Sequence, residues 1–295
     1  MGRETGNAFW RLQSALFLGV GLCLSALTAW AAGLSIPSGA EFNVAGGEFH
    51  LQLDGNSGDL TNSGVLSATD GIIYLNGDWT MTGAGYYSGG NGSVYFTAAT
   101  GTQTLTPGSD AADEFGTLAH HAAGTVVLTD HDLDVNGDFI NTAGIFSSNS
   151  LNMSVAGDWT NTGTFSYGVD GAVYLDGTDQ TIYGSTDFYD LVKEIPSATG
   201  HTLTFEALSE QTVANSLTLK GFSESDGERL LLRSSTSTNE QAYLTLASGG
   251  EQDIRYVDVE NNNAENGMTL LGRDSADAGS NDNWQIGTIT ITWTG

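Results

Sequence analysis

A short motif of Gly-Asp, an apolar or aromatic residue and a following turn recurs along this chain at intervals of about twenty residues. Its clearest copies contain Asp138 and Asp158, which are one interval apart, and an earlier copy contains Asp78, three such intervals before Asp138. A weaker copy at Asp59 precedes Asp78 by nearly one interval. Self-similarity at such a period indicates a repeat protein, in which each unit buries its apolar face against its neighbours.

The segments between these motifs have the pattern of short β-strands. Apolar and polar residues alternate in them, and Gly, Asn, Asp, Ser and Thr separate them. After the N-terminal leader, no segment of ten or more residues sustains a helical period. The alternating runs, which place the chain in the all-β class, are 48–53, 92–96, 125–128, 132–135, 151–155, 216–219, 243–246 and 255–259.

Among all-β architectures, a parallel β-solenoid accounts best for the period. A propeller blade takes about 40 to 50 residues, and a sandwich has no reason to keep so regular a register. We therefore predict a right-handed parallel β-helix with about 20 residues per coil, and thus roughly 13 coils in a rod about 60 Å long. A longer repeat relates the strand at Val94 to the one at Val173, which predicts that about four coils form a larger unit.

Residues 1–31 have the features of a secretory signal peptide. Arg3 and Arg11 precede an apolar run, and Ala29-Trp30-Ala31 fits a cleavage site of small residues. The alternative is a membrane anchor, but the run is shorter than the roughly 20 apolar residues of a spanning helix. We expect export and cleavage, a secreted or cell-surface location, and no membrane insertion of the mature chain.

The remaining chain divides into parts of different residue composition. We predict the solenoid over residues 32–285, with repeat units over about 50–210 and a closing Leu-rich part over about 211–285. Residues 286–295 alternate Thr with apolar residues, and they are the start of a further β module or a truncated end.

Charge and cysteine content limit the partners. The 295-residue chain has 35 Asp and Glu against 8 Lys and Arg, a formal net charge of −27. Such a surface repels nucleic acids and anionic membranes, so we expect neither as a partner. The single cysteine, Cys23, lies in the leader, so the mature chain has no disulfide and depends on its core and backbone pairing for stability.

The repeated motif itself has both a structural and a functional interpretation. Its carboxylates could hold calcium between coils, but Asp also accepts backbone N–H bonds at turns, and no calcium-solenoid repeat is present. Trp79, Phe139 and Trp159 could form an exposed row for sugar stacking. Since they occupy one position of the repeat, we expect a buried core stack instead.

The histidines suggest a metal site only weakly. His131 lies between aspartates in the run 130–134, where alternation would place His131 on one face of a strand and the carboxylates on the other. A zinc site would have to recruit His120 or His121 from another coil, and no ligand spacing supports that. We therefore predict no catalytic, cofactor-binding or metal-ligating residue.

Two further functions would need patterns that the sequence lacks. A polysaccharide lyase or hydrolase on a parallel β-helix would need clustered carboxylates, with a basic residue in a lyase, and we find no paired-Asp, Gly-His-Gly, Ser-His-Asp or P-loop pattern. An ice- or mineral-facing solenoid would need a flat, regular Thr or Asp array. We expect the Thr-x-Thr strings not to be kept from coil to coil.

Several motifs together resemble those of a known group of proteins. They are the Asn-Gly-Asp-Trp unit at 76–79, Gly-Thr-Gln-Thr at 101–104 with its counterpart Gly-Thr-Asp-Gln-Thr at 177–181, Arg-Ser-Ser at 233–235, Tyr-Val-Asp-Val at 256–259 and Asn-Asp-Asn-Trp at 281–284. Over about residues 50–285 the chain resembles the β-helical repeats of large secreted bacterial surface proteins of the filamentous-haemagglutinin-like, or adhesin-like, kind. The resemblance implies a scaffold.

We therefore expect a non-enzymatic structural or adhesive β-solenoid stalk of a secreted or cell-surface bacterial protein, without a cofactor. Its expected partners are glycans or proteins of host or neighbouring cells, or further copies of itself. The alternative is a carbohydrate-active enzyme, a polysaccharide lyase or hydrolase, on the same fold.

Overall fold

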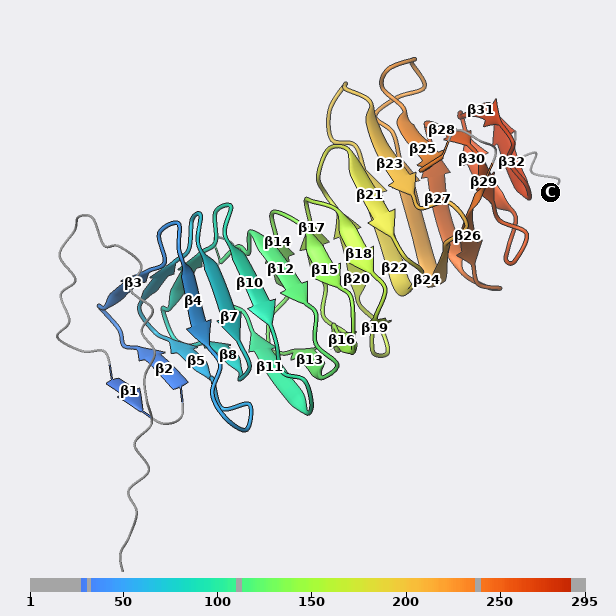
Figure 1. The fold of residues 1–295 in the computed structure, drawn as a ribbon. Coiled ribbons are helices and arrows are strands. Elements are labelled where there is room, and N and C mark those ends of the chain that lie inside the picture. Colours follow the sequence, from blue (N-terminus) through green and yellow to red (C-terminus); the bar gives the residue numbers. More distant parts are fainter. Residues whose placement is uncertain (1–27, 31–32, 110–112, 237–239, 288–295) are drawn as a thin grey trace, which may run out of the picture.

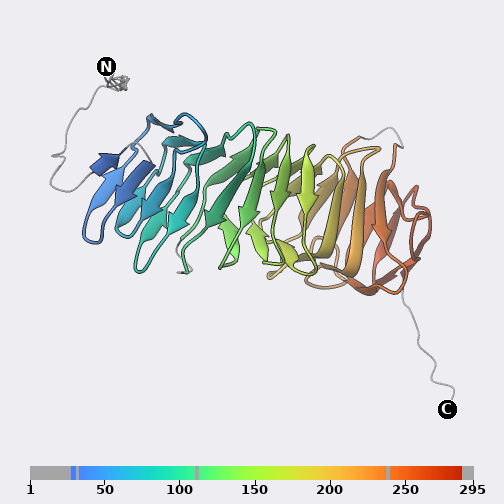
Figure 2. The same ribbon diagram turned by 90° about the horizontal axis from the view of Figure 1, so that it is seen from below.

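The structure is a computed structural model that describes residues 28–30, 33–109, 113–236 and 240–287. Over these residues the chain forms a β-solenoid of about 10 turns without a helix, and the turns are about 23 residues apart. Figure 1 and Figure 2 show a rod with β2 near one end and β32 at the other. The predicted all-β parallel solenoid is confirmed. Its turns are longer than the sequence period suggested, so they are fewer than predicted.

Two predicted segments fall largely beyond this description. Residues 1–27 and 31 of the predicted signal peptide, and residues 288–295 of the predicted final module, lie outside the described residues.

Two sheets run along much of the rod. The 8-stranded sheet contains β1 (Thr28–Trp30), β2 (Gly33–Ile36), β5 (Leu60–Asn62), β8 (Trp79–Met81), β11 (Thr102–Thr106), β13 (Thr125–Leu128), β16 (Ile145–Ser147) and β19 (Thr164–Ser166). The 11-stranded sheet contains β4 (Glu48–Leu51), β7 (Ile72–Leu75), β10 (Ser93–Phe96), β12 (Thr117–His120), β15 (Phe139–Asn141), β18 (Trp159–Asn161), β21 (Gln180–Tyr183), β23 (His201–Phe205), β25 (Leu230–Ser234), β28 (Val257–Glu260) and β31 (Ala276–Gly279).

The third side is built from two sheets. Nearest the N-terminal end it is the 3-stranded sheet of β3 (Glu41–Asn43), β6 (Val65–Ser67) and β9 (Tyr86–Ser88). The bridges Ser88↔Glu114 and Phe115↔Val135 continue it into the 10-stranded sheet. That sheet contains β14 (Leu133–Val135), β17 (Met153–Val155), β20 (Ala172–Leu175), β22 (Thr186–Glu194), β24 (Glu210–Lys220), β26 (Ala242–Leu246), β27 (Glu251–Arg255), β29 (Asn262–Asn263), β30 (Leu270–Arg273) and β32 (Trp284–Gly287).

The chain therefore winds around a three-sided core. From β22 onwards the 8-stranded sheet has ended, and each strand of the 11-stranded sheet is followed by one or two strands of the 10-stranded sheet. The long strand β24 pairs with β26 through its first half and with β27 through its second half, so it covers two sides in one element. Among the strands that the structure describes, every pairing is parallel except that of β1 with β2, which is antiparallel.

The core is a column of inward side chains from successive turns. Phe139 and Trp159 pair in register, and their rings are 4.3 Å apart between centroids. Phe165 packs edge-on against Trp159 at 5.0 Å. Outward positions alternate with these buried ones, as strand periodicity requires. Each turn thus covers the apolar side chains of the turn before it.

The longer repeat, which relates Val94 to Val173, does not mark a stack of equivalent turns. Val94 lies in β10 of the 11-stranded sheet, whereas Val173 lies in β20 of the 10-stranded sheet. From β10 the chain makes three turns, to β12, β15 and β18, and then passes through β19 to reach β20. The predicted four-coil unit is therefore wrong, because the two copies lie on different sides.

Candidate functional site

The Gly-Asp motifs form ladders at two corners of the solenoid. Asp138 Oδ1 accepts the backbone N–H of Asp158 at 2.8 Å, and Asp158 Oδ1 accepts that of Thr181 at 2.7 Å. At the other corner Asp59 accepts the N–H of Asp78 at 2.9 Å. The predicted N–H acceptor role is confirmed, although the donors come from the following turn. Among the described residues, no group of three or more His, Cys, Asp or Glu could hold a metal ion.

The aromatic residues of the motifs belong to the core. The predicted burial is confirmed, since Trp79, Phe139 and Trp159 have no exposed surface. Their predicted common position is wrong for Trp79, which lies in β8 of the 8-stranded sheet, while the other two lie in the 11-stranded sheet. None of the three can stack on a sugar from solvent.

The predicted histidine candidates do not come together. His120 is buried, and its Nδ1 lies 2.9 Å from Asn141 Oδ1, whose amide in turn donates to Asn161 Oδ1 at 2.8 Å. His121 is exposed and bonds Thr142 at 2.6 Å. His131 is exposed and lies in the corner before β14, which begins at residue 133. The alternation expected over 130–134 is wrong for its first three residues.

An outward aromatic row on the 11-stranded sheet was not predicted. His50 stacks on Tyr74 with centroids 4.5 Å apart, and Tyr74 stacks on Tyr95 at 4.9 Å. The outward position of Tyr in the strands 72–75 and 93–96 was the available signal. The rings cover each other's faces, so this row stabilises the sheet and leaves mainly ring edges for a ligand.

Carboxylates gather on the outer side of the third face. Burial raises the pKa of Asp134, and the negative charges of Asp176 and Glu114 raise it further. A hollow of about 210 Å³ lies beside them on β20 and β22. Its lining residues are Tyr174, Leu175, Asp176, Val192 and Glu194. This is the arrangement in the described chain that comes closest to the predicted enzymatic alternative.

Lys193 in β22 is a basic side chain inside the core, with no exposed surface. Its Nζ donates to the carbonyl oxygens of residues 177–178 at 2.5 and 3.1 Å and to Gln180 Oε1 at 2.6 Å. Burial lowers its pKa to about 8, against the opposing effect of Asp176 and Asp179. Its partners are corner groups of the preceding turn, so this lysine ties two turns together.

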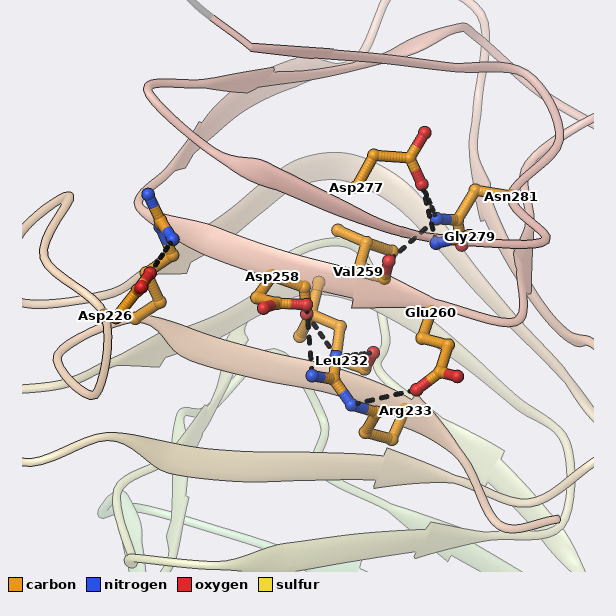
Figure 3. A network of polar contacts seen from close by, with 10 residues as sticks. Asp226, Leu232, Arg233, Asp258, Val259, Glu260, Asp277, Gly279 and Asn281 are labelled. Atoms are coloured by element: carbon orange, nitrogen blue, oxygen red, sulfur yellow. Dashed lines mark hydrogen bonds and ion pairs between the residues drawn. The ribbon is translucent and has the colours of Figure 1, made fainter. Parts of the chain in front are cut away.

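The motifs of the closing part also join consecutive turns. Figure 3 shows Arg233 of β25 reaching across to β28, where Nη2 lies 3.0 Å from Asp258 Oδ1 and Nε lies 3.4 Å from Glu260 Oε2. One turn further, Asn281 donates to the carbonyl oxygen of Val259 at 2.8 Å. These polar contacts hold the last turns in register and do not converge on an open site.

The outer side of the 8-stranded sheet carries columns in which Thr and Ser are mixed with Val and Ile. Thr104 pairs with Val127, Val127 with Ser147, and Ser147 with Ser166. The neighbouring column follows the same pairing and consists of Thr102, Thr125, Ile145 and Thr164. The expectation that Thr-x-Thr strings are not kept from coil to coil is therefore confirmed, because Thr102 and Thr104 of one turn are followed by Thr125 and Val127 and then by Ile145 and Ser147. Corners of unequal length nevertheless bring the strands themselves into register.

No protein-family model, curated protein or solved structure matches this chain. Within the described residues there is no helix long and apolar enough to cross a membrane.

Proposed function

We propose that this chain is a non-enzymatic structural and adhesive β-solenoid stalk of an exported bacterial surface protein. The observation that carries the proposal is the rod of about 10 stacked turns. In such a stack each turn contacts only its neighbours, so length and stiffness grow with the number of turns. The leader pattern of residues 1–31 supports export.

The polar side chains of the repeats support a scaffold role, because they form hydrogen bonds between consecutive turns. The motif carboxylates accept backbone N–H groups of the next turn, and the buried amides of Asn141 and Asn161 bond each other. Gln180 donates to the carbonyl oxygens of Val155 and Gly157 at 2.9 and 2.6 Å. Groups consumed in this way are not free for chemistry on a substrate.

The proposed partners are glycans or proteins of host or neighbouring cells, or further copies of the chain. A net charge of −27 favours neutral or basic surfaces over nucleic acids and anionic lipids. No cofactor is proposed.

Export and adhesion can be tested with the full chain fused to a C-terminal reporter in a bacterial host. We expect the leader to be removed and the reporter to reach the outside, and we expect beads coated with the purified protein to adhere to cells or to each other. The matched control lacks residues 1–31 and should remain in the cytoplasm. An uncleaved, cell-retained fusion, or beads that adhere no better than uncoated ones, would contradict the proposal.

The rival function, a carbohydrate-active enzyme, is favoured by one observation, the raised pKa of Asp134 beside Asp176 and Glu114. A raised carboxyl pKa is what a general acid requires. The test is release of reducing ends or unsaturated uronides from a panel of neutral and acidic polysaccharides. Activity that Asp134→Asn and Asp176→Asn each abolish would establish the enzyme and refute the scaffold. We expect no activity in the wild type.

A further inference from the structure

The hollow on β20 and β22 combines apolar side chains with two carboxylates. Tyr174 and Val192 pair in register on neighbouring turns, and both line the hollow. Asp176 directly follows β20, and Glu194 is the last residue of β22. Because the two strands run parallel, their ends lie side by side, and both carboxylates stand at the same edge of the hollow. A ligand would therefore meet a ring and methyl groups, with hydrogen-bond acceptors along one edge.

Tyr174 has a ring that no other aromatic side chain covers. Its in-register neighbours are Ser154 and Val192, and the residue is 39% exposed. No ring contact within the described part of the chain involves Tyr174, whereas Tyr74 and Tyr95 of the outward row stack on each other at 4.9 Å. A ligand can thus lie against this ring without displacing another one.

The two carboxylates of the hollow each have a basic side chain of the protein beside them. The chain has 8 Lys and Arg, two of which lie within residues 1–31, so six remain. One of the six is Lys220, whose Nζ lies 2.7 Å from Glu194 Oε1. Another is Lys193; burial lowers its pKa to about 8, and the negative charge of Asp176 opposes that shift. Asp176 therefore lies within the field of the buried ammonium, and the hollow favours a neutral ligand over a cation.

Both carboxylates keep oxygens that can accept further hydrogen bonds. The contact with Lys220 uses only Oε1 of Glu194, and within the described residues the carboxylate of Asp176 has no hydrogen-bonded partner. The ion pair with Lys220 also fixes the position of Glu194, so less side-chain entropy is lost when a ligand binds. The acceptors are thus available and partly held in place.

We propose that this hollow binds one neutral pyranose unit of a surface glycan. The proposal rests on the proposed adhesive stalk, and it names the site with which the stalk holds a sugar. A pyranose ring has an apolar face of C–H groups, which can lie against Tyr174 and Val192. Its hydroxyl groups can donate to Asp176 and Glu194 at the edge. The volume of about 210 Å³ is smaller than that of pockets for drug-sized ligands, so it accommodates one sugar unit of a longer chain.

Other ligands fit this hollow less well. An anionic sugar would meet the negative charges of Asp176 and Glu114, which add to the effect of burial in raising the pKa of Asp134. Calcium takes six to eight oxygen ligands, and no group of three or more His, Cys, Asp or Glu in the described chain could hold a metal ion. A second copy of the chain carries the same net charge of −27, which opposes its approach.

The test is affinity electrophoresis of the full chain in native gels that contain dextran, mannan, galactan or a soluble β-glucan. We expect at least one of these neutral polysaccharides to retard the wild type. Tyr174→Ala should weaken that binding about tenfold, which corresponds to about 1.4 kcal/mol, whereas Tyr174→Phe keeps the ring and should retain most of the affinity. The matched control is Tyr183→Ala, which removes a ring of 40% exposure from the 11-stranded sheet and should bind like the wild type. Circular dichroism must show the same fold in all variants.

Several results would overturn the proposal. One is a wild type that no neutral polysaccharide retards, and another is equal weakening by Tyr174→Ala and Tyr183→Ala. Retardation by chitosan alone, which Tyr174→Ala abolishes, would reassign the hollow to a cationic amine. Release of reducing ends from the bound polysaccharide would reassign it to the enzymatic alternative.

The stalk function is measured separately, by export of the reporter fusion and by bead adhesion. If Tyr174→Ala is exported and its beads adhere like those of the wild type, the stalk function stands and the hollow does not carry the adhesion. If the purified wild type binds a neutral polysaccharide but is neither exported nor adhesive on beads, the sugar site stands and the stalk function fails.

Discussion

Replacing Lys193 by methionine should remove a pH dependence of stability that the buried amine imposes on the fold. The side chain has no exposed surface, and burial lowers its pKa from 10.5 to about 8. Methionine has a similar length and no charge, so it keeps most of the packing. The variant therefore separates the cost of the buried charge from the cost of a cavity.

The size of the effect follows from these two pKa values. Below pH 8 the amine is charged in both states, and the native state bears the full cost of burying the charge. Between pH 8 and 10.5 the native amine is neutral while the unfolded one still holds its proton. The unfolded state then binds more protons, so the free energy of unfolding rises with pH. At about 1.36 kcal/mol per pH unit, the gain over this window is about 3 kcal/mol.

The assay is urea unfolding across that pH window, followed by the fluorescence of the buried tryptophans. The free energy of unfolding of the wild type relative to Lys193→Met should rise by about 3 kcal/mol from the low to the high end. Lys220→Met is the matched control. Hydrogen bonds to Asp253 and Glu194 raise the pKa of Lys220, so its titration lies above the window and its difference from the wild type should stay flat. Parallel curves for the wild type and Lys193→Met would refute the reasoning.

Three further changes test other parts of the stack. Burial lowers the pKa of His120 from 6.5, so the protein should lose stability as the pH falls below that value, and His120→Gln should lose less in the same urea assay; equal acid sensitivity would contradict this. Phe139→Ala should destabilise by about 3–5 kcal/mol in chemical denaturation, well beyond Tyr183→Ala at an exposed outward position, and similar losses would argue against a stacked aromatic core. Gly157→Ala should lower the melting temperature more than Gly47→Ala, because a Cβ at 157 would lie 2.4 Å from the backbone of Gly137 while one at 47 has only an ordinary contact at 4.0 Å; an unchanged melting temperature would mean that the corner is not closely stacked.

The stacking of the chain was predictable where the corners have constant length. Phe139 pairs with Trp159, and their separation in the sequence equals that of the motif residues Asp138 and Asp158 just before them. The number of turns was not predictable in this way, because insertions at corners leave no trace in the motif. Leu203 pairs with Leu232, well beyond one motif interval, although both strands are ordinary alternating runs. The mean length of a turn is therefore about 23 residues, which is longer than the motif interval, and the rod has fewer turns than that interval predicts.

The inward position of Lys193 could have been predicted from the alternation of its neighbours, but a basic side chain argues against such a position. Leu191, Lys193 and Ile195 share one parity in and after β22, and all three are buried. A charged residue at an inward position is uncommon, so the sequence alone gives little reason to place Lys193 in a strand. What makes the position tolerable is Gln180 on the preceding turn, and no local pattern around Lys193 reveals that partner.

The outer side of the 8-stranded sheet shows why the neighbours on a solenoid surface cannot be predicted from the sequence. Thr104, Val127 and Ser147 are successive members of one column, although the first interval in the sequence is longer than the second. Their alignment depends on the corner lengths, which only the structure supplies. Folding of a solenoid depends mainly on its inward residues, so it places little demand on outward ones. The Thr and Ser residues of this outer side are therefore not dictated by the packing of the core, and only the structure shows which of them become neighbours.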